Sequence, residues 1–327
     1  MKVAVVGTFG NGQLATALAR GMRAAEQDVI EISDAHELPG NKLARFAVER
    51  WAVASIALTI ARGGQDDLVD NVVEARPDLV LIVKSPYLTR NTVAQIRNQT
   101  RALVVNWLPD DPFLALRPAM KLATLTAYDL VVTYSDTICW RLTSELGLSA
   151  MVIPFGFDPS DYRPATARSV EWDVTFVGQW SKYRERILWE IARTGLALRV
   201  YGPNWHHAQS KVRDCWNSTE AYGADACTRY QQGHVGINIL HPRNNAGSHN
   251  MRTFEVPAAG CKMLTTETAQ QRHLLEGIGG IDFYSAETDL AQRVKSLVAS
   301  VQLPDEAAMS KHTYKHRCVQ LLRKVGR

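Results

Sequence analysis

The sequence predicts an α/β protein built from two doubly wound parallel sheets, and three observations support this prediction. Short apolar runs of four to six residues recur along the whole chain of 327 residues, and helix-like stretches separate them. These runs are continuously apolar rather than alternating, which is typical of strands buried on both faces of a parallel sheet. The polar segment 156–172 divides the runs into two sets, and a chain of this length suits two domains.

Each half of the chain holds its own set of expected strands. The first set covers the ranges 2–7, 28–33, 78–83, 102–108, 129–134 and 150–155. The second set covers the ranges 173–178, 197–202, 235–240, 262–266 and 281–285. Helices between parallel strands imply right-handed βαβ units, whose ligands lie beyond the carboxyl ends of the strands. We therefore expect two Rossmann-like domains, 1–158 and 173–304, with a linker at 159–172 and a ligand-binding cleft between the domains.

Composition excludes several classes of protein. The chain is 46% hydrophobic and 21% charged, and its longest apolar stretch, 51–61, is far shorter than the ~20 residues of a membrane span. The N-terminus enters a strand-like segment directly, so we expect no signal peptide. The five cysteines form no CxxC pair and indicate reduced thiols in a cytoplasmic protein. A net charge of +4 is too small to predict nucleic-acid binding, and no compact zinc site is formed by His206, His207, Cys215 and Cys227.

The loop after the first expected strand is rich in glycine and allows two interpretations. Gly7, Gly10 and Gly12 follow the strand, although their spacing differs from the GxGxxG pattern of dinucleotide-binding sites. Glu31 follows at a distance of about twenty residues, where an acid can hold a ribose hydroxyl of NAD or NADP. Alternatively, the glycines only allow the strand and the next helix to pack closely. A nicotinamide-dependent oxidoreductase is thus one functional hypothesis.

Four stretches at the ends of successive strands in the second half point elsewhere. They are VGQWSKYRER (177–186), YGPNW (201–205), NILHPRNNAGSHNMRTFEVPAAG (238–260) and LTTET (264–268). Together they resemble the CgeB-like (spore-maturation type) glycosyltransferases, a branch of the GT-B superfamily. The most specific part is FEVPAAG with the preceding Asn-Met-Arg. The resemblance extends to the segments 77–88, 106–113, 154–159 and 312–317.

This resemblance implies the GT-B fold, in which the first domain binds an acceptor and the second binds a nucleoside-diphosphate sugar. Gly10 and Gly12 would then line the acceptor side rather than a nicotinamide site. We expect a sugar nucleotide, UDP-linked first of all, as a substrate, and neither a cofactor nor a metal ion.

Basic residues gather where a helix is expected to begin after Gly178. Free backbone N–H groups and the helix dipole can face a phosphate there, and Lys182, Arg184 and Arg186 add cations. By spacing, Arg184 best matches the basic residue that lies near the phosphates in the family. The alternative is a solvated basic helix start, although cations oppose the dipole at a helix N-terminus and so favour an anion there.

Glu255 is the strongest single candidate for donor binding. Many GT-B enzymes have a glutamate here that accepts hydrogen bonds from both ribose hydroxyls, a task suited to a carboxylate with two oxygens. Arg252 and Asn250 lie just upstream, where they can meet the diphosphate or the sugar. The alternative for Glu255 is a first-turn acid that complements the helix dipole, with Pro257 also tolerated in that turn.

The other donor-side candidates are weaker. Gly202 ends a strand near the place expected for the nucleobase of the donor, and Thr266 lies in the LTTET stretch. His241 can face the sugar or the β-phosphate, or it can be an ordinary half-buried histidine. Many retaining families carry a second glutamate eight residues before the ribose glutamate, but this chain has Gly247 there. The stereochemical outcome therefore stays open, and so does a non-catalytic protein that only binds sugar nucleotides or glycans.

The first domain offers candidates for a general base. The NWLPDDPF stretch ends a strand with Asp110 and Asp111, and a base must lie within hydrogen-bond reach of the acceptor hydroxyl. Asp111 before Pro112 also reads as a helix cap with proline at the first helical position, so Asp110 is the better candidate. Lys84 and Tyr134 end neighbouring strands and either contact the acceptor or stand at the rim.

Two helical segments complete the sequence-based hypotheses. Residues 41–62 form a basic amphipathic stretch, which fits either peripheral contact with the inner face of an anionic membrane or a helix docked on the sheet. The segment 305–325 reads as one helix, and GT-B chains often end with a helix that returns to the first domain. His312, Tyr314 and Arg317 would then serve packing rather than catalysis.

Overall fold

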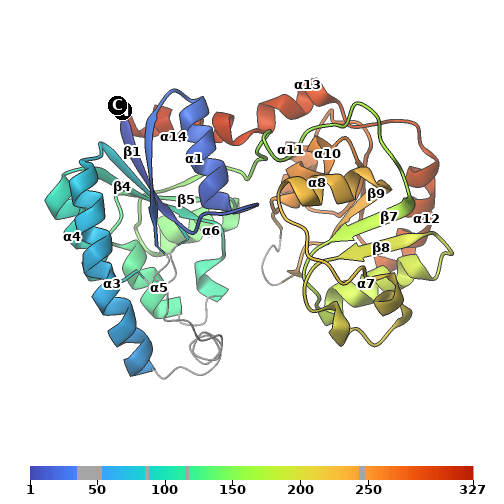
Figure 1. Cartoon of the computed structure of the whole chain (residues 1–327), viewed down its shortest axis with the longest axis horizontal. Coiled ribbons are helices and arrows are strands. Elements are labelled where there is room, and N and C mark those ends of the chain that lie inside the picture. Colours follow the sequence, from blue (N-terminus) through green and yellow to red (C-terminus); the bar gives the residue numbers. More distant parts are fainter. Residues whose placement is uncertain (35–53, 85–87, 115–117, 243–246, 327) are drawn as a thin grey trace. The chain divides into compact units, whose positions relative to one another are not determined.

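The computed structural model describes residues 1–34, 54–84, 88–114, 118–242 and 247–326 and divides the chain into two compact units (Figure 1). The first unit combines Met1–Ile153 with Cys318–Arg327, and the second is the continuous stretch Pro154–Arg317. The expected boundaries placed 154–158 in the first domain and 305–317 in a helix that packs on it. The structure groups both segments with the second unit.

The first unit is a parallel sheet with helices on both faces (Figure 1). Its strands are β1 (Lys2–Gly7), β2 (Asp28–Ser33), β3 (Leu79–Val83), β4 (Leu103–Leu108), β5 (Leu130–Thr133) and β6 (Ala150–Val152), in the order β2-β1-β3-β4-β5-β6. Its helices and turns are α1 (Leu14–Ala24), α3 (Ala54–Ala75), α4 (Arg90–Thr100), η1 (Pro112–Leu114), α5 (Pro118–Leu125), α6 (Asp136–Trp140) and η2 (Arg141–Glu145). Every residue of β3 is buried, as its continuously apolar sequence predicts.

The second unit repeats this architecture with five parallel strands. They are β7 (Trp172–Val177), β8 (Leu198–Tyr201), β9 (Gly233–Asn238), β10 (Lys262–Thr266) and β11 (Ile281–Tyr284), in the order β11-β10-β9-β7-β8. Its helices and turns are α7 (Lys182–Ala192), η3 (Trp205–His207), η4 (Lys211–Cys215), α8 (Ala224–Gln231), α10 (Arg252–Ala258), α11 (Ala269–Leu274), α12 (Glu287–Ala299), α13 (Glu306–Met309) and η5 (Ser310–His312), and α14 (Tyr314–Val325) begins in it. All eleven expected strands are present, and the doubly wound α/β fold is confirmed.

The order of the strands places a ligand site in each unit. The chain leaves β1 toward β2 and returns on the other side to β3, so the switch point of the first sheet lies between β1 and β3. In the second sheet it lies between β7 and β9. Open parallel sheets bind ligands outside the carboxyl ends of the strands at such points. The residues that follow β3 and β7 are therefore the first to consider in each unit.

The C-terminal segment differs from the single helix expected over 305–325. It consists of α13, η5 and α14, and the interruption falls at Thr313. The backbone N–H of Phe157 donates to the His312 carbonyl at 3.1 Å, and that of Tyr314 donates to the Phe157 carbonyl at 3.0 Å. These two bonds bind the chain next to Phe157 and take the place of helical bonds, which explains the interruption. Helix α14 passes from the second unit into the first, where the Cys318 thiol lies 3.6 Å from the Leu18 carbonyl.

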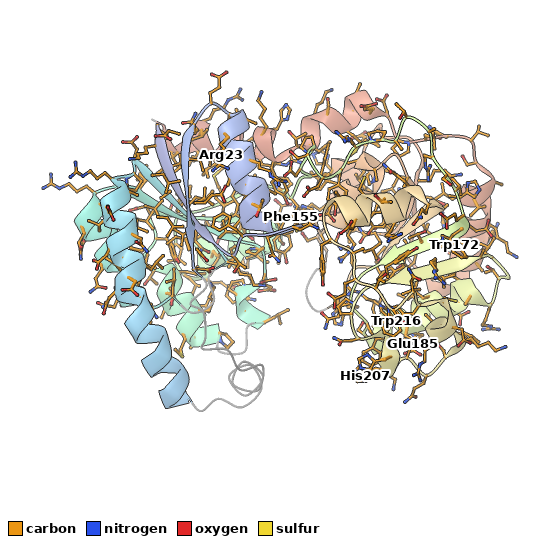
Figure 2. The ribbon with its side chains drawn as sticks, in the orientation of Figure 1. Arg23, Phe155, Trp172, Glu185, His207 and Trp216 are labelled. Carbon is orange, nitrogen blue, oxygen red and sulfur yellow. The ribbon has the colours of Figure 1, made fainter. Side chains whose placement is uncertain are left out.

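A buried network of hydrogen bonds holds the start of the second unit in place. The backbone N–H of Phe155 (labelled in Figure 2) donates to Nε2 of His249 at 3.0 Å, and Nε of Arg317 donates to the Phe155 carbonyl at 2.9 Å. A second guanidinium nitrogen of Arg317 lies 3.0 Å from Nδ1 of His312, whose ring stacks on Phe254. Burial lowers the pKa of His249 to about 3. In the described structure His312 and Arg317 thus pack within the second unit.

The basic amphipathic stretch at 41–62 can be followed only in part. Residues 41–53 lie outside the described residues, and α3 begins at Ala54. In the part of the chain that the structure describes, no helix is both long enough and apolar enough to cross a membrane.

His249 makes a prediction about acid stability. Its folded-state pKa is below the usual value of 6.5, so the unfolded chain binds the proton more readily as the pH falls from about 6.5 to about 3. Stability linked to His249 is therefore complete above pH 6.5 and is lost toward pH 3. His249→Gln keeps an acceptor for Phe155 without titrating, so between pH 7 and pH 4.5 it should lose on the order of 2 kcal/mol less unfolding free energy than the wild type.

Urea unfolding of both proteins at the two pH values measures this difference. Equal losses of stability in the variant and the wild type would show that His249 does not carry the effect.

Candidate functional site

The ends of β7 and β8 touch at two glycines. The backbone N–H of Gly178 donates to the Tyr201 carbonyl at 2.8 Å, and the indole of Trp205 donates to the Gly178 carbonyl at 2.7 Å. Gly202 has φ of +127°, and a Cβ atom there would lie 2.3 Å from the Gly178 carbonyl oxygen. Trp216 (labelled in Figure 2) donates to the Gly202 carbonyl at 3.0 Å. Only glycine fits at position 202, and the contact fixes the loop that leads into α7.

Helix α7 begins directly after this loop, as predicted. The Ser181 hydroxyl caps the helix by accepting a hydrogen bond from the Arg184 backbone N–H at 3.2 Å. The Arg184 side chain folds back over the loop, where Nη1 donates to the Gln179 carbonyl at 2.9 Å. The guanidinium of Arg184 is therefore held beside the loop that leads into α7.

A second guanidinium meets the first at the end of β7. Nε of Arg252, on α10, donates to the Val177 carbonyl at 2.8 Å, and one terminal nitrogen lies 3.4 Å from the place of a Cβ on Gly178. Burial lowers the pKa of Arg184 to about 10, and the nearby charge of Arg252 adds to this effect. Two cations that repel each other at the carboxyl end of a central strand form a site that favours an anion.

The two other basic residues of this segment lie apart from the pair. Arg186 forms an ion pair with Glu287 at 2.6 Å, and Lys182 is exposed in the first turn of α7. Of the three predicted cations on α7, Arg184 is the one that lies close enough to Arg252 for the two charges to repel. Arg186 therefore has a structural explanation in its partner on α12.

Glu255 lies one turn along α10 from Arg252. Burial raises the pKa of its carboxyl group to about 7, while the charge of Arg252 and a hydrogen bond with Tyr162 oppose this rise. Tyr162 is 5% exposed and comes from the segment expected to be a polar linker. A carboxyl group that titrates near neutral pH and stands beside an anion site can change its charge when a ligand donates hydrogen bonds to it.

Asn250 is engaged in holding the start of α10. Its Oδ1 accepts a hydrogen bond from the Thr253 backbone N–H at 3.1 Å, and its amide nitrogen donates to Oδ1 of Asn238 at 2.9 Å. The Thr253 hydroxyl in turn donates to Oε1 of Gln271 at 2.7 Å. Asn238, Thr253 and Gln271 are fully buried. Asn250 thus positions Arg252 and Glu255, whatever else it contacts.

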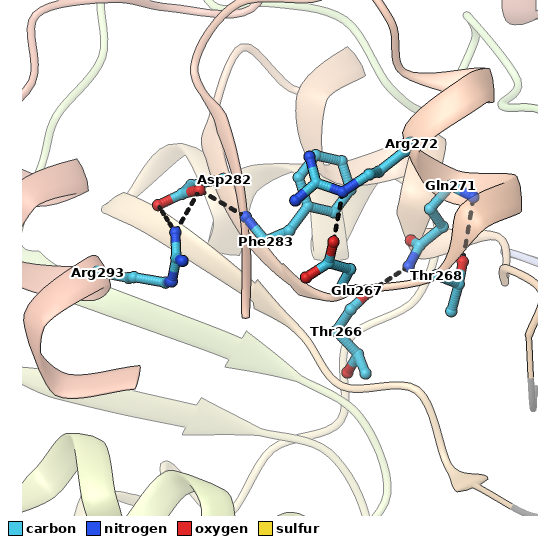
Figure 3. Close-up of polar contacts among 8 residues, drawn as sticks. All are labelled: Thr266, Glu267, Thr268, Gln271, Arg272, Asp282, Phe283 and Arg293. Atoms are coloured by element: carbon cyan, nitrogen blue, oxygen red, sulfur yellow. Dashed lines mark hydrogen bonds and ion pairs between the residues drawn. The ribbon is translucent and has the colours of Figure 1, made fainter. Parts of the chain in front are cut away.

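Thr266 belongs to the same buried framework at the end of β10. The Gln271 amide donates to the Thr266 carbonyl at 2.6 Å, and the Thr268 hydroxyl caps α11 (Figure 3). The Thr266 hydroxyl donates to the Tyr284 hydroxyl at 3.0 Å and accepts from the Leu240 backbone N–H at 3.1 Å. Both bonding directions of this hydroxyl are used, so Thr266 ties three strand ends together.

The candidate catalytic residue His241 and the departure at Gly247 lie around the segment 243–246, which is outside the described residues. His241 is half-buried, and its ring packs edge-on against Tyr183 at a centroid distance of 5.9 Å. Gly247, where the second glutamate of retaining families would stand, is exposed with φ of +73°.

In the first unit, the structure brings together charged residues that follow three neighbouring strands. Nζ of Lys84, after β3, lies 2.9 Å from Oδ2 of Asp110, after β4. Nζ of Lys121, on α5, donates to the Lys84 carbonyl at 3.0 Å. Tyr134, after β5, is only 2% exposed, and burial raises its pKa, with further contributions from Asp111 and Asp110. Tyr134 is therefore an inner wall of this cluster rather than a rim residue.

Asp111 takes the capping role expected from its proline neighbour. Its Oδ1 accepts the Phe113 backbone N–H at 2.9 Å at the start of η1. The residue that sequence reasoning missed here is Lys121. It lies in a short, mostly apolar helix, and no local motif distinguishes it from a surface lysine.

The glycine-rich loop has a packing explanation. A Cβ at Gly7 would lie 2.9 Å from the Cβ of Ala15 on α1, so the glycine lets the strand and helix approach. Gly10 and Gly12 follow in the turn with φ of +148° and +68°. Glu31, the expected ribose ligand of a nicotinamide cofactor, forms an ion pair with Arg23 at 2.6 Å. Among the described residues, no group of three or more His, Cys, Asp or Glu side chains is arranged to hold a metal ion.

The contact between the two glycines makes a prediction that separates steric clash from backbone strain. Gly202→Ala should lower the free energy of unfolding, measured in urea, by roughly 1–3 kcal/mol more than the cost of the backbone conformation alone, because the added methyl group has no space. Gly195→Ala is the matched control, since Gly195 also has positive φ (+81°) but nothing within 4 Å of the added atom. Similar destabilisation of the two variants would mean that the strand ends can separate freely.

Comparisons with known proteins agree with this architecture. Residues 184–323 match a family model described as glycosyl transferase-like. Among solved structures, AviGT4, a glycosyltransferase involved in avilamycin A biosynthesis, is 13% identical with a TM-score of 0.64, over 99% of this chain and 96% of its own. An Escherichia coli trehalose-6-phosphate protein bound with UDP-2-fluoro glucose is 11% identical with a TM-score of 0.64, over 99% and 98% of the two chains.

The same fold also occurs in a protein with another activity. The UDP-GlcNAc 2-epimerase from Methanocaldococcus jannaschii is 10% identical with a TM-score of 0.57, over 100% of this chain and 99% of its own. A search of curated protein sequences gave no match. The chain has the GT-B fold, and its residues 184–323 match a glycosyl transferase-like family model.

Proposed function

We propose that the protein transfers a sugar from a nucleoside-diphosphate donor to a hydroxyl group of an acceptor. The observation that carries this proposal is the pair of guanidinium groups, Arg184 and Arg252, that meet at the end of β7 with the Glu255 carboxyl group one turn away. This arrangement offers cations to a diphosphate and a carboxylate to a ribose.

In the proposed reaction, the bond between the anomeric carbon of the sugar and the diphosphate oxygen breaks, and its electron pair leaves with the diphosphate. Arg184 and Arg252 stabilise the charge that develops on this leaving group. The acceptor oxygen forms the new bond to the anomeric carbon, and its proton passes to Asp110. Asp110 is partly exposed beside Lys84, where an acceptor can reach it. No step of this scheme requires a metal ion.

The donor and the subfamily are finer parts of the proposal. A UDP-linked sugar is supported by the structural neighbours that carry UDP-sugar ligands or names. Membership in the CgeB-like branch is supported by the FEVPAAG stretch of α10, which carries Glu255. Contact with a membrane through residues 41–62 stays a prediction. The nicotinamide alternative is not favoured, because packing accounts for Gly7 and Arg23 pairs with Glu31.

The first test is thermal stabilisation of the purified protein by UDP, GDP, dTDP, NAD and NADP. A ligand at 100 times its dissociation constant adds about 2.7 kcal/mol of stability. We expect a shift with one nucleoside diphosphate that is lost in Glu255→Gln. A shift with NAD or NADP alone would overturn the proposal. Binding of the donor without transfer or hydrolysis on any acceptor would leave a sugar-nucleotide-binding protein instead.

Arg184 makes a prediction about which part of the ligand it holds. Arg184→Met should weaken binding of UDP by about tenfold or more, because a charge-assisted hydrogen bond is lost, and should leave the affinity for uridine unchanged. The variant without ligand should be no less stable to heat than the wild type, since one of two repelling cations is gone.

Isothermal titration with UDP and with uridine measures both affinities. Arg186→Met is the matched control on the same helix, and its UDP affinity should stay at the wild-type level. An equal loss of affinity for UDP in the two variants would indicate general attraction by positive charge rather than a specific site.

Glu255 makes a prediction about proton release. Its pKa near 7 means that the carboxyl group is mostly protonated at pH 6.5, and ribose hydroxyls that donate to it favour the charged form. Binding of UDP at pH 6.5 should therefore release more protons from the wild type than from Glu255→Gln, and the excess should vanish by pH 9. Titrations in buffers of different ionisation enthalpy measure this excess. Equal proton release by both proteins at pH 6.5 would remove Glu255 from the ribose site.

A further inference from the structure

Lys84 has an unusual backbone conformation for its place in the fold. Six non-glycine residues with positive φ occur in the described part of the chain, and three of them, Glu26, Arg76 and Arg101, lie within two residues of a helix end. A left-handed residue is the ordinary way to end a helix. Lys84 instead follows the central strand β3 with φ of +64°, at the switch point of the sheet. A strained residue at such a place is typical of a functional site.

Two hydrogen bonds hold Lys84 in this conformation. Its backbone N–H donates to the Trp107 carbonyl at 3.0 Å, which continues the pairing of β3 with β4. Its carbonyl accepts the ammonium group of Lys121 at 3.0 Å. The first bond belongs to the sheet, whereas the second comes from a side chain on α5. Lys121 therefore supplies the side chain that holds the Lys84 carbonyl.

The conformation of Lys84 sets the position of the ion pair with Asp110. The side chains of Lys84 and Asp110 are 58% and 61% exposed, and an exposed pair of this kind contributes little ordering by itself. The fixed position of the Lys84 side chain must therefore come from the backbone conformation of Lys84. A chain that left the left-handed conformation would carry Nζ of Lys84 away from Oδ2 of Asp110, which now lies 2.9 Å from it.

We propose that Lys121 is a positioning residue for the acceptor side: by holding the Lys84 carbonyl, it keeps Lys84 beside Asp110 and so fixes the carboxylate that receives the acceptor proton. This inference rests on the role of Asp110 in the proposed function. A charged donor suits this task, because a hydrogen bond from an ammonium group is about twice as strong as one from a neutral group. Methionine would fill the same space without making the bond.

The surroundings of Lys121 add a dependence on pH. Burial lowers its pKa to about 8; the charge of Lys84 acts in the same direction and that of Asp110 opposes it. Asp111 and Tyr134 belong to the same cluster, because the charges of Asp111 and Asp110 both act on the Tyr134 hydroxyl group. As the pH rises through about 8, Lys121 loses its charge and its bond to Lys84 weakens. The rate should therefore fall on the alkaline side, although the neutral amine can still donate.

Crystal structures of two variants test the geometry without any assay. In Lys121→Met, Lys84 should leave the left-handed conformation and Nζ of Lys84 should no longer lie within 4 Å of Asp110. The matched control is Lys324→Met, which alters an exposed lysine of α14 in the same unit and should leave Lys84 unchanged. A left-handed Lys84 in Lys121→Met would overturn the inference.

Hydrolysis of a probe donor, with water as the acceptor, tests the consequence for the reaction. The probe is whichever of UDP-glucose, GDP-mannose and dTDP-glucose the wild type cleaves fastest. Lys121→Met should lower kcat by about ten- to a hundredfold with little change in KM. Lys121→Arg should recover most of the rate and move the alkaline limb to higher pH, because arginine keeps its charge.

The outcomes separate this inference from the proposed function. If Lys121→Met matches the wild type while Asp110→Asn is inactive, Lys121 has no positioning role. If Asp110→Asn is as active as the wild type, the assignment of the base in the proposed function is wrong, whatever the structures show of Lys84. If none of the three donors is cleaved, the conformation of Lys84 in the two crystal structures decides the inference.

Discussion

The second unit of this protein depends on the contact between two strand ends. Gly202 lies so close to the Gly178 carbonyl that a side chain at position 202 has no space. The indole of Trp205 donates a hydrogen bond to the same Gly178 carbonyl. Because the loop between β7 and α7 cannot move away, Arg184 enters its helix at a fixed place. Arg252 reaches the same strand end from α10 through the Val177 carbonyl. The repulsion between these two cations is thus a consequence of backbone packing.

The two units use charge in different ways at equivalent places in their sheets. At the switch point of the second sheet, two guanidinium groups face each other and the nearest carboxyl group is raised in pKa by burial. At the switch point of the first sheet, two ammonium groups stand around one exposed carboxylate. In the first arrangement the Glu255 carboxyl group acts on Arg252, and the two guanidinium groups outnumber it. In the second arrangement Asp111 lies close to Asp110, so two carboxylates match the two ammonium groups.

The fold was predictable from the sequence because buried parallel strands leave a continuous apolar signal, and all eleven strands are present near their expected ranges. Glu255 and Arg252 could be singled out because they share a short motif at one strand end. Tyr162 and Lys121 could not, since each acts from a segment without a motif and meets its partner only in three dimensions. The interruption at Thr313 was missed for a similar reason, because its cause is pairing with Phe157, far away in the sequence.

The connectivity of the two units has a practical side. The second unit is one uninterrupted stretch, Pro154–Arg317, whereas the first is completed by Cys318–Arg327 after the chain has passed through the second. Tyr162, which bonds with Glu255, and Arg317, which holds Phe155, both lie near the ends of this stretch and belong to it. A chimeric enzyme that exchanges donor preference should therefore be cut at 153/154 and 317/318. A cut at the polar segment around 172 would separate Tyr162 from its hydrogen-bond partner Glu255.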